Sequence, residues 1–121
     1  MIQTLTNNDL IEYLSRQLKN SFPDNIPIEN LADIIDKALE KIKYCFNHIS
    51  LPYYSKDNKP FFNHLNADHY TVFIYYCSNL AFKNNDIDLA GKLFYLNKTL
   101  HSFHCMYDTD LPDIFIICHG V

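Results

Sequence analysis

The sequence predicts an all-α fold: an antiparallel helical domain of about four main helices with a short extended C-terminal segment. Three observations lead to this prediction. Apolar residues recur at spacings of three and four along most of the chain, which is the pattern of amphipathic helices. Only 2 of the 121 residues are glycine, whereas a chain built from many tight β-turns needs more. The length is that of one domain, so we expect a single helical domain over residues 1–121.

Two helices are predicted in the first half of the chain. The first covers residues 7–20, where leucines repeat at helical spacing. The second covers residues 27–49, because Pro27 suits a first helical turn and an apolar stripe then continues to the end of this segment. We expect this stripe to pack in the core or at a subunit interface.

The second half contains two more predicted helices, after an irregular connection over residues 50–63. The segment 67–83 is apolar nearly all round, and its β-branched and aromatic residues would also fit a strand. Its length and its lack of glycine and proline favour a buried helix instead. Leucines at spacings of four and three predict the last helix over residues 87–103. The isoleucine-rich run at 111–118 is predicted to be an extended strand, with no partner strand evident in the sequence.

Charge and hydropathy exclude several classes of function. The net charge is −4 and the lysines are scattered, so there is no basic surface for nucleic acid or anionic membranes. No uncharged apolar run is long enough to span a bilayer, and the N-terminus lacks the features of a signal peptide. We therefore expect a cytoplasmic protein with four reduced cysteines, without nucleic-acid or membrane partners. The helical surfaces are expected to support a homo-oligomer.

Two groups of histidines are the candidates for chemistry. His64, Asp68 and His69 lie close together before the third predicted helix, where an acid beside two histidines could orient a general base. The alternative, which we favour, is that Asp68 caps the helix. His101 and His104 have the spacing of shared metal ligands, but imidazolium groups are also favourable at a helix C-terminus. No metal site is predicted, because the sequence does not identify the further ligands.

Several short segments stand in a fixed order in the second half of the chain. They are His-Leu-Asn-Ala-Asp-His-Tyr at 64–70, Phe-Ile-Tyr-Tyr at 73–76, the segment 88–98, Leu-Pro-Asp-Ile-Phe at 111–115 and His-Gly-Val at 119–121. With these features, about half of the chain resembles the N-terminal helical domain of the serine O-acetyltransferase-like hexapeptide-repeat acyltransferases. Gly120 stands where that family usually has proline. The first two helices are similar to the family in layout more than in residues.

The resemblance implies acetyl-CoA-dependent transfer of an acetyl group to serine or a related hydroxyl acceptor, as in cysteine biosynthesis. In the family, the catalytic histidine and the acetyl-CoA groove lie on a β-helix of six-residue repeats, which this chain lacks. The resemblance therefore implies a fragment or truncated product that is inactive alone and binds no cofactor, with acetyl-CoA as the family's co-substrate. It places no catalytic residue in this chain and gives His119 a structural role.

Only His64 and Asp68 are candidates for the acceptor side of an active site. These two roles also follow from the resemblance, since the helical domain of the family contributes to the acceptor side. The alternative to a transferase domain is a free-standing helical oligomerisation or protein-binding module without catalysis.

Overall fold

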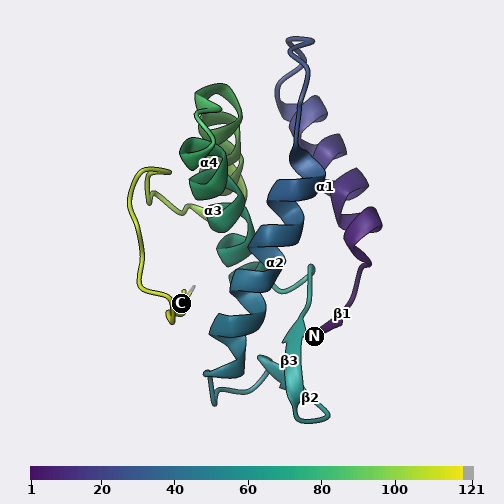
Figure 1. The fold of residues 1–121 in the computed structure, drawn as a ribbon, viewed down its shortest axis with the longest axis vertical. Helices are drawn as coiled ribbons and strands as arrows, with labels where there is room; N and C mark the ends of the chain where they lie inside the picture. The colour runs from purple at the N-terminus through teal and green to yellow at the C-terminus, as the bar shows by residue number, and fades with distance from the viewer. Residues whose placement is uncertain (119–121) are drawn as a thin grey trace.

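The computed structural model of the chain describes residues 1–118, so His119 and the role expected for it lie outside the described residues. The described part is mostly helical and also contains a small sheet (Figure 1). The predicted all-α class is therefore right for most of the chain and incomplete, because it leaves out the sheet. In chain order the elements are β1 (Ile2–Gln3), α1 (Asn7–Ser21), α2 (Leu31–Asn47), β2 (Ser55–Lys56), β3 (Lys59–Phe62), α3 (Ala67–Lys83) and α4 (Ile87–His101).

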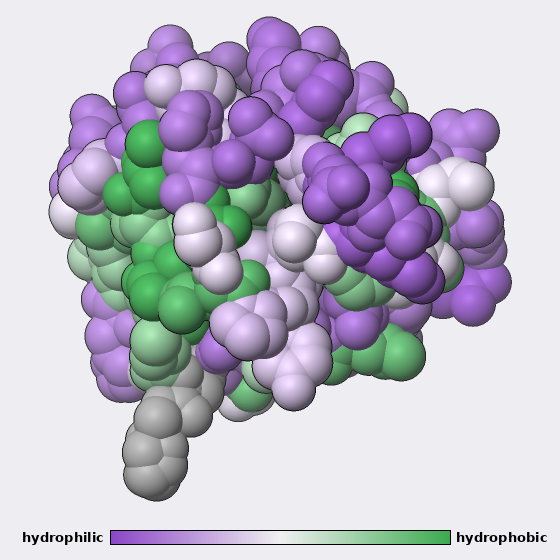
Figure 2. Space-filling model, turned by 90° about the horizontal axis from the view of Figure 1, so that it is seen from below, coloured by the Kyte–Doolittle hydropathy of each residue, from purple (hydrophilic) through white to green (hydrophobic). Residues whose placement is uncertain are grey.

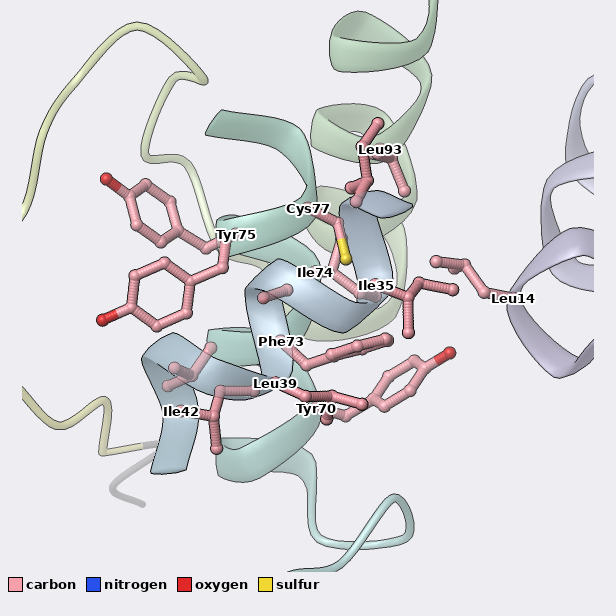
Figure 3. Close-up of a cluster of buried hydrophobic side chains, with 14 of the residues drawn as sticks. Leu14, Ile35, Leu39, Ile42, Tyr70, Phe73, Ile74, Tyr75, Cys77 and Leu93 are labelled. Atoms are coloured by element: carbon pink, nitrogen blue, oxygen red, sulfur yellow. The ribbon is translucent and has the colours of Figure 1, made fainter. Parts of the chain in front are cut away.

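Helix α3 forms the centre of the core and packs against both α2 and α4. Its side chains are buried on nearly every side, and Figure 3 shows Phe73, Ile74 and Cys77 among side chains from the neighbouring helices. A helix that is apolar all round is expected where other elements surround it. The segment 67–83 is therefore the predicted helix, and the alternative of a strand is wrong.

Hydrogen bonds of buried polar side chains fix α3 against α4. The Ser78 hydroxyl donates to the carbonyl oxygen of Ala90 at 2.8 Å, and the Asn97 amide donates to the carbonyl oxygen of Thr71 at 3.0 Å. Both bonds satisfy groups that water cannot reach. Because each bond joins a side chain of one helix to the backbone of the other, the pair sets how the two helices align.

Helix α2 is shorter than the predicted segment 27–49. It begins after Asn30, whose φ of 59° lies in the left-handed region and interrupts the helical path. Pro27 therefore lies in the preceding loop and does not start the helix. At the other end, His48 follows the last helical residue with a φ of −103°. The apolar stripe of α2 is buried in this chain's own core, so it is not available as a subunit interface.

The ends of α3 and α4 are determined by local caps. The Asn66 side chain accepts hydrogen bonds from the backbone N–H groups of Asp68 and His69, so Asn66 is the N-cap of α3 and the predicted cap at Asp68 is wrong. Helix α4 ends at His101, before the predicted boundary at 103, because Ser102 adopts a left-handed φ of 54°. None of the helices among residues 1–118 is both long enough and apolar enough to span a bilayer.

A three-stranded sheet in the order β1-β3-β2 lies at the lower end of the molecule (Figure 1). Strand β1 pairs with β3 in parallel, and β2 pairs with β3 in an antiparallel hairpin. Asp57 and Asn58 form the hairpin turn with φ values of 53° and 62°, as a two-residue turn with both residues left-handed requires. The predicted irregular connection over 50–63 therefore contains ordered β-structure.

Residues 103–118, which we call the C-terminal strap, cross the surface of α3 without helix or strand. The Tyr75 hydroxyl donates to the carbonyl oxygen of Thr109 and accepts from the N–H of Leu111. Further along, the Cys45 thiol donates to the carbonyl oxygen of Phe115 at 3.2 Å. The strand predicted over 111–118 is not formed: among the described residues this segment belongs to no sheet, and it bends at Asp113 and Ile114. Hydrogen bonds with Tyr75 and Cys45 hold its backbone in place of a partner strand.

The strap is covered on its inner side only. Phe115 and Ile117 pack against the core, whereas Ile114 and Ile116 are 44% and 40% exposed. Figure 2 shows hydrophobic surface gathered at the lower end of the molecule, on the side where the strap lies. Exposed and partly buried side chains therefore alternate along residues 114–117.

Candidate functional site

The predicted acceptor-side residues lie at the corner between β3 and α3. His64 belongs to the turn that joins the two elements, and Asp68 is the second residue of α3. The turn is closed by a backbone hydrogen bond from the N–H of Asn66 to the carbonyl oxygen of Asn63. His64 and Asp68 therefore lie at the same corner. The chemical role open to each depends on the groups that it contacts.

The His64 ring faces the N-terminal segment of the chain. Its Nδ1 lies 2.7 Å from the Thr4 hydroxyl, and the same hydroxyl accepts a hydrogen bond from the His64 backbone N–H at 2.9 Å. The Thr4 hydroxyl has a single proton, and the carbonyl oxygen of Phe62, 3.5 Å away, is a second acceptor for it. Burial lowers the pKa of His64, so the ring is neutral at pH 7.

The Asp68 carboxylate interacts electrostatically with Tyr54 and His69. Its charge raises the pKa of Tyr54 and of His69, so the carboxylate lies within electrostatic range of both groups. The contacts of His64 are instead with Thr4 and with the ring of Tyr13, whose centroid is 5.3 Å away. The two predicted residues share the corner, but they face different neighbours.

His69 is fully buried and has a structural role at this corner. Its Nδ1 accepts a hydrogen bond from the backbone N–H of Asn63 at 3.0 Å, which holds the turn in place. Its Nε2 has no hydrogen-bond partner among the described residues, and the rings of Phe46 and Tyr54 lie 4.8 Å away, centroid to centroid. Burial lowers the pKa of His69 to about 4, so the imidazole is neutral and inert as a base at pH 7.

Tyr54 connects this corner to the strap, and sequence reasoning did not identify it. Burial, with the nearby Asp68, Cys118 and Cys45, raises the pKa of its phenol to about 12. The phenol is therefore protonated and able to donate a hydrogen bond. No motif marks Tyr54 in the sequence, because its role depends on the hairpin that folds it back onto α2 and α3.

The other candidate chemistry does not form a site. The His101 ring lies 2.6 Å from the Asn97 side chain and closes the end of α4. Within residues 1–118, no three His, Cys, Asp or Glu side chains come together as metal ligands. Burial raises the pKa of Cys45 and of Cys77, so these thiols are not poised as nucleophiles.

A cavity of about 480 Å³ lies apart from the corner, between the end of α1 and the loop that follows it. Lys92 lines it with a side chain that is only 10% exposed. The Lys92 ammonium contacts Asp24 at 2.8 Å and Asp88 at 3.1 Å, so carboxylates of this chain already neutralise it. These contacts raise the pKa of Lys92 and lower that of Asp24, and they fasten the loop to α4.

The corner thus offers a neutral imidazole, a carboxylate and a protonated phenol, without a nucleophile or a metal centre in the described residues. The Tyr54 side chain is buried, whereas His64 and Asp68 are partly exposed. No protein-family model, curated protein or solved structure matches the chain.

Proposed function

We propose that the chain is the N-terminal helical domain of a serine O-acetyltransferase-like enzyme and acts in the cytoplasm. In this proposal a β-helix of six-residue repeats, carried by a longer product of the same gene, supplies the acetyl-CoA groove and the catalytic histidine. The helical domain contributes the acceptor side, and the reaction is acetyl transfer to serine or a related hydroxyl.

One observation carries the proposal. Tyr54 lies within electrostatic range of both Asp68 and Cys118, so the acceptor-side candidate and the last described residue of the strap belong to the same end of the molecule. In this proposal the β-helix follows the strap in the sequence. Acceptor-binding groups near the end of the strap would therefore lie close to the added catalytic module. The exposed Ile114 and Ile116 on the strap also suit coverage by another part of an enzyme.

The placement of the similar segments gives further support. The segment 64–70 forms the corner and the first turn of α3, and the segment 88–98 lies within α4. The segment 111–115 forms the part of the strap that Tyr75 and Cys45 hold. Of these three segments, two therefore lie at the corner or in the strap, and the third lies within α4.

Acetyl transfer can be measured with and without a catalytic module. Residues 1–121 alone are expected to release no CoA from acetyl-CoA in the presence of serine. Joined in frame to a hexapeptide-repeat β-helix of a serine acetyltransferase, they are expected to support serine-dependent CoA release. Asp68→Asn should raise the KM for serine, whereas Asp9→Asn, an exposed acid in the first turn of α1, should leave it unchanged.

Binding of acetyl-CoA by the fusion protein makes a negative result interpretable, since that groove lies on the β-helix alone. A fusion that binds acetyl-CoA and yet acetylates no hydroxyl acceptor contradicts the proposal. Turnover by residues 1–121 alone contradicts it as well, because the helical domain would then contain its own catalytic centre.

A free-standing oligomerisation or protein-binding module remains the second candidate function. Its support is that the strap is fastened to the helices by Asn79 as well, whose amide donates to the carbonyl oxygen of Tyr107 at 2.9 Å. A strap held at several points is compatible with a stable chain that needs no further module. In that case the purified chain is soluble and monodisperse, and light scattering that reports polydisperse aggregate contradicts it.

A further inference from the structure

Gly91 lies in the middle of α4, where nothing among residues 1–118 requires a glycine. A Cβ atom built on Gly91 meets no atom within 4 Å, and its φ is not positive. Glycine in a helix interior destabilises the helix relative to alanine, since it loses more backbone entropy on folding. No contact or backbone angle among residues 1–118 explains the glycine. Close contact with a second molecule would explain it.

Gly91 stands between two large, exposed apolar side chains on α4. Ile87 and Tyr95 lie one turn before and one turn after it on the same face of α4, and they are 49% and 56% exposed. Leu93 points the opposite way, into the core (Figure 3). This outer stripe of α4 is thus a small residue flanked by two bulky ones, a shape into which another helix can fit closely.

We propose that α4 binds α4 of a second copy of this chain, with the two helices antiparallel and crossing at Gly91. About a two-fold axis at Gly91, Ile87 of one copy faces Tyr95 of the other, and the reverse contact is identical. The stripe is therefore complementary to itself in shape, and a second copy is the partner that satisfies it at both ends.

The charges of α4 favour the same antiparallel arrangement. Its first turn carries Asp88, which also pairs with Lys92 of the same helix at 3.1 Å, and its last turn carries Lys98 and His101. Antiparallel crossing puts the acidic start of one helix near the basic end of the other, and it also opposes the two helix dipoles. A parallel crossing would instead bring like charges together at both ends.

Tyr95 is already held in position for such a contact. The Phe94 ring lies 5.6 Å from the Tyr95 ring, and the Lys98 ammonium lies 5.9 Å from its centroid. An aromatic side chain that is fixed before binding loses little conformational freedom on association. Since one helix from each copy supplies the contact, we expect a weak dimer that depends on concentration.

Gly91→Ala separates this proposal from a merely structural account, because the two effects have opposite signs. Within one protomer the added methyl group meets nothing, so the alanine variant should unfold at a higher urea concentration than the native chain. In the dimer the methyl group stands at the point of closest approach, so the dissociation constant measured by sedimentation velocity should rise at least about tenfold. Tyr95→Ser should also weaken the dimer by about tenfold.

Tyr44→Ser is the matched control, since Tyr44 is 54% exposed on α2 and lies outside the proposed contact. It should leave the dissociation constant unchanged. A chain that remains monomeric up to about 1 mM, where even millimolar affinity would be detected, overturns the proposal. A dimer that Gly91→Ala leaves intact and Tyr44→Ser dissociates overturns it too.

Discussion

Acidification from about pH 6.5 to about pH 4 is expected to destabilise the fold mainly through His69. Its imidazole is fully buried, its Nδ1 accepts the Asn63 N–H, and aromatic rings surround the rest of it. A proton on Nδ1 would remove that hydrogen bond and place a charge in an apolar environment. Asp68 compensates in part, because its charge favours the protonated ring.

The magnitude follows from the two pKa values of His69. The pKa is about 4 in the folded chain and 6.5 in the unfolded chain. Because the unfolded chain binds the proton more readily, stability is complete above pH 6.5 and falls as the pH drops toward 4. The difference of about 2.5 pKa units corresponds to about 3 kcal/mol in total, of which about 2 kcal/mol is already lost at pH 5.

Urea unfolding at a series of pH values measures this loss directly. The native chain should lose about 2 kcal/mol of unfolding free energy between pH 7.5 and pH 5. His69→Asn keeps an acceptor near the position of Nδ1 but does not titrate there. We expect this variant to be less stable at pH 7.5, because it leaves a cavity, and to show a much flatter pH dependence.

His64→Asn is the control for the second titrating histidine of the corner, whose pKa is also lowered by burial. It should retain most of the pH dependence, because His64 is partly exposed and His69 is not. If His69→Asn loses stability with falling pH as steeply as the native chain, the buried imidazole is not the source and the reasoning is refuted.

Three further substitutions test the packing. Phe73→Ala removes a fully buried ring from the centre of α3 and should lower the unfolding free energy by about 3–5 kcal/mol in urea. Lys92→Met removes the ammonium that fastens the loop before α2 to α4, so limited proteolysis should cut that loop faster while the helical circular dichroism is retained. Tyr75→Phe removes the hydroxyl that binds the strap, so hydrogen exchange at the Leu111 amide should accelerate, whereas unchanged exchange would mean that the hydroxyl does not hold the strap.

Periodicity was sufficient to predict α1, α2 and α4, because burial on one side leaves a regular apolar pattern. It was not sufficient for α3, whose segment is apolar nearly all round; there the length and the absence of glycine and proline outweighed the β-forming residues. The beginning of α2 was harder to predict. Pro27 is compatible with a first turn, but the left-handed Asn30 comes after it, and no local rule forces that conformation on this asparagine.

The sheet was missed although one local signal for it exists. Asp57 and Asn58 are residues that tolerate positive φ, and they stand between two short segments that can pair. The strands have two to four residues each, which is too short for an alternating pattern to be recognised. The parallel pairing of β1 with β3 joins segments about 60 residues apart in the sequence. Local sequence patterns cannot predict such a pairing.

The candidate corner was predictable only in part. The sequence places His64, Asp68 and His69 close together, but it cannot tell which of them is buried. The structure makes His69 a fully buried support and turns His64 toward Thr4. Tyr54 joins the corner through tertiary packing alone, so its raised pKa has no counterpart in the local sequence.

The most direct test of the proposed function is the DNA sequence beyond the Val121 codon in the source genome. If this chain is the helical domain of a serine O-acetyltransferase-like enzyme, the reading frame continues into six-residue repeats with an apolar residue at a fixed position in each. A stop codon directly after Val121 would contradict that account, and it would make the free-standing binding module the better explanation.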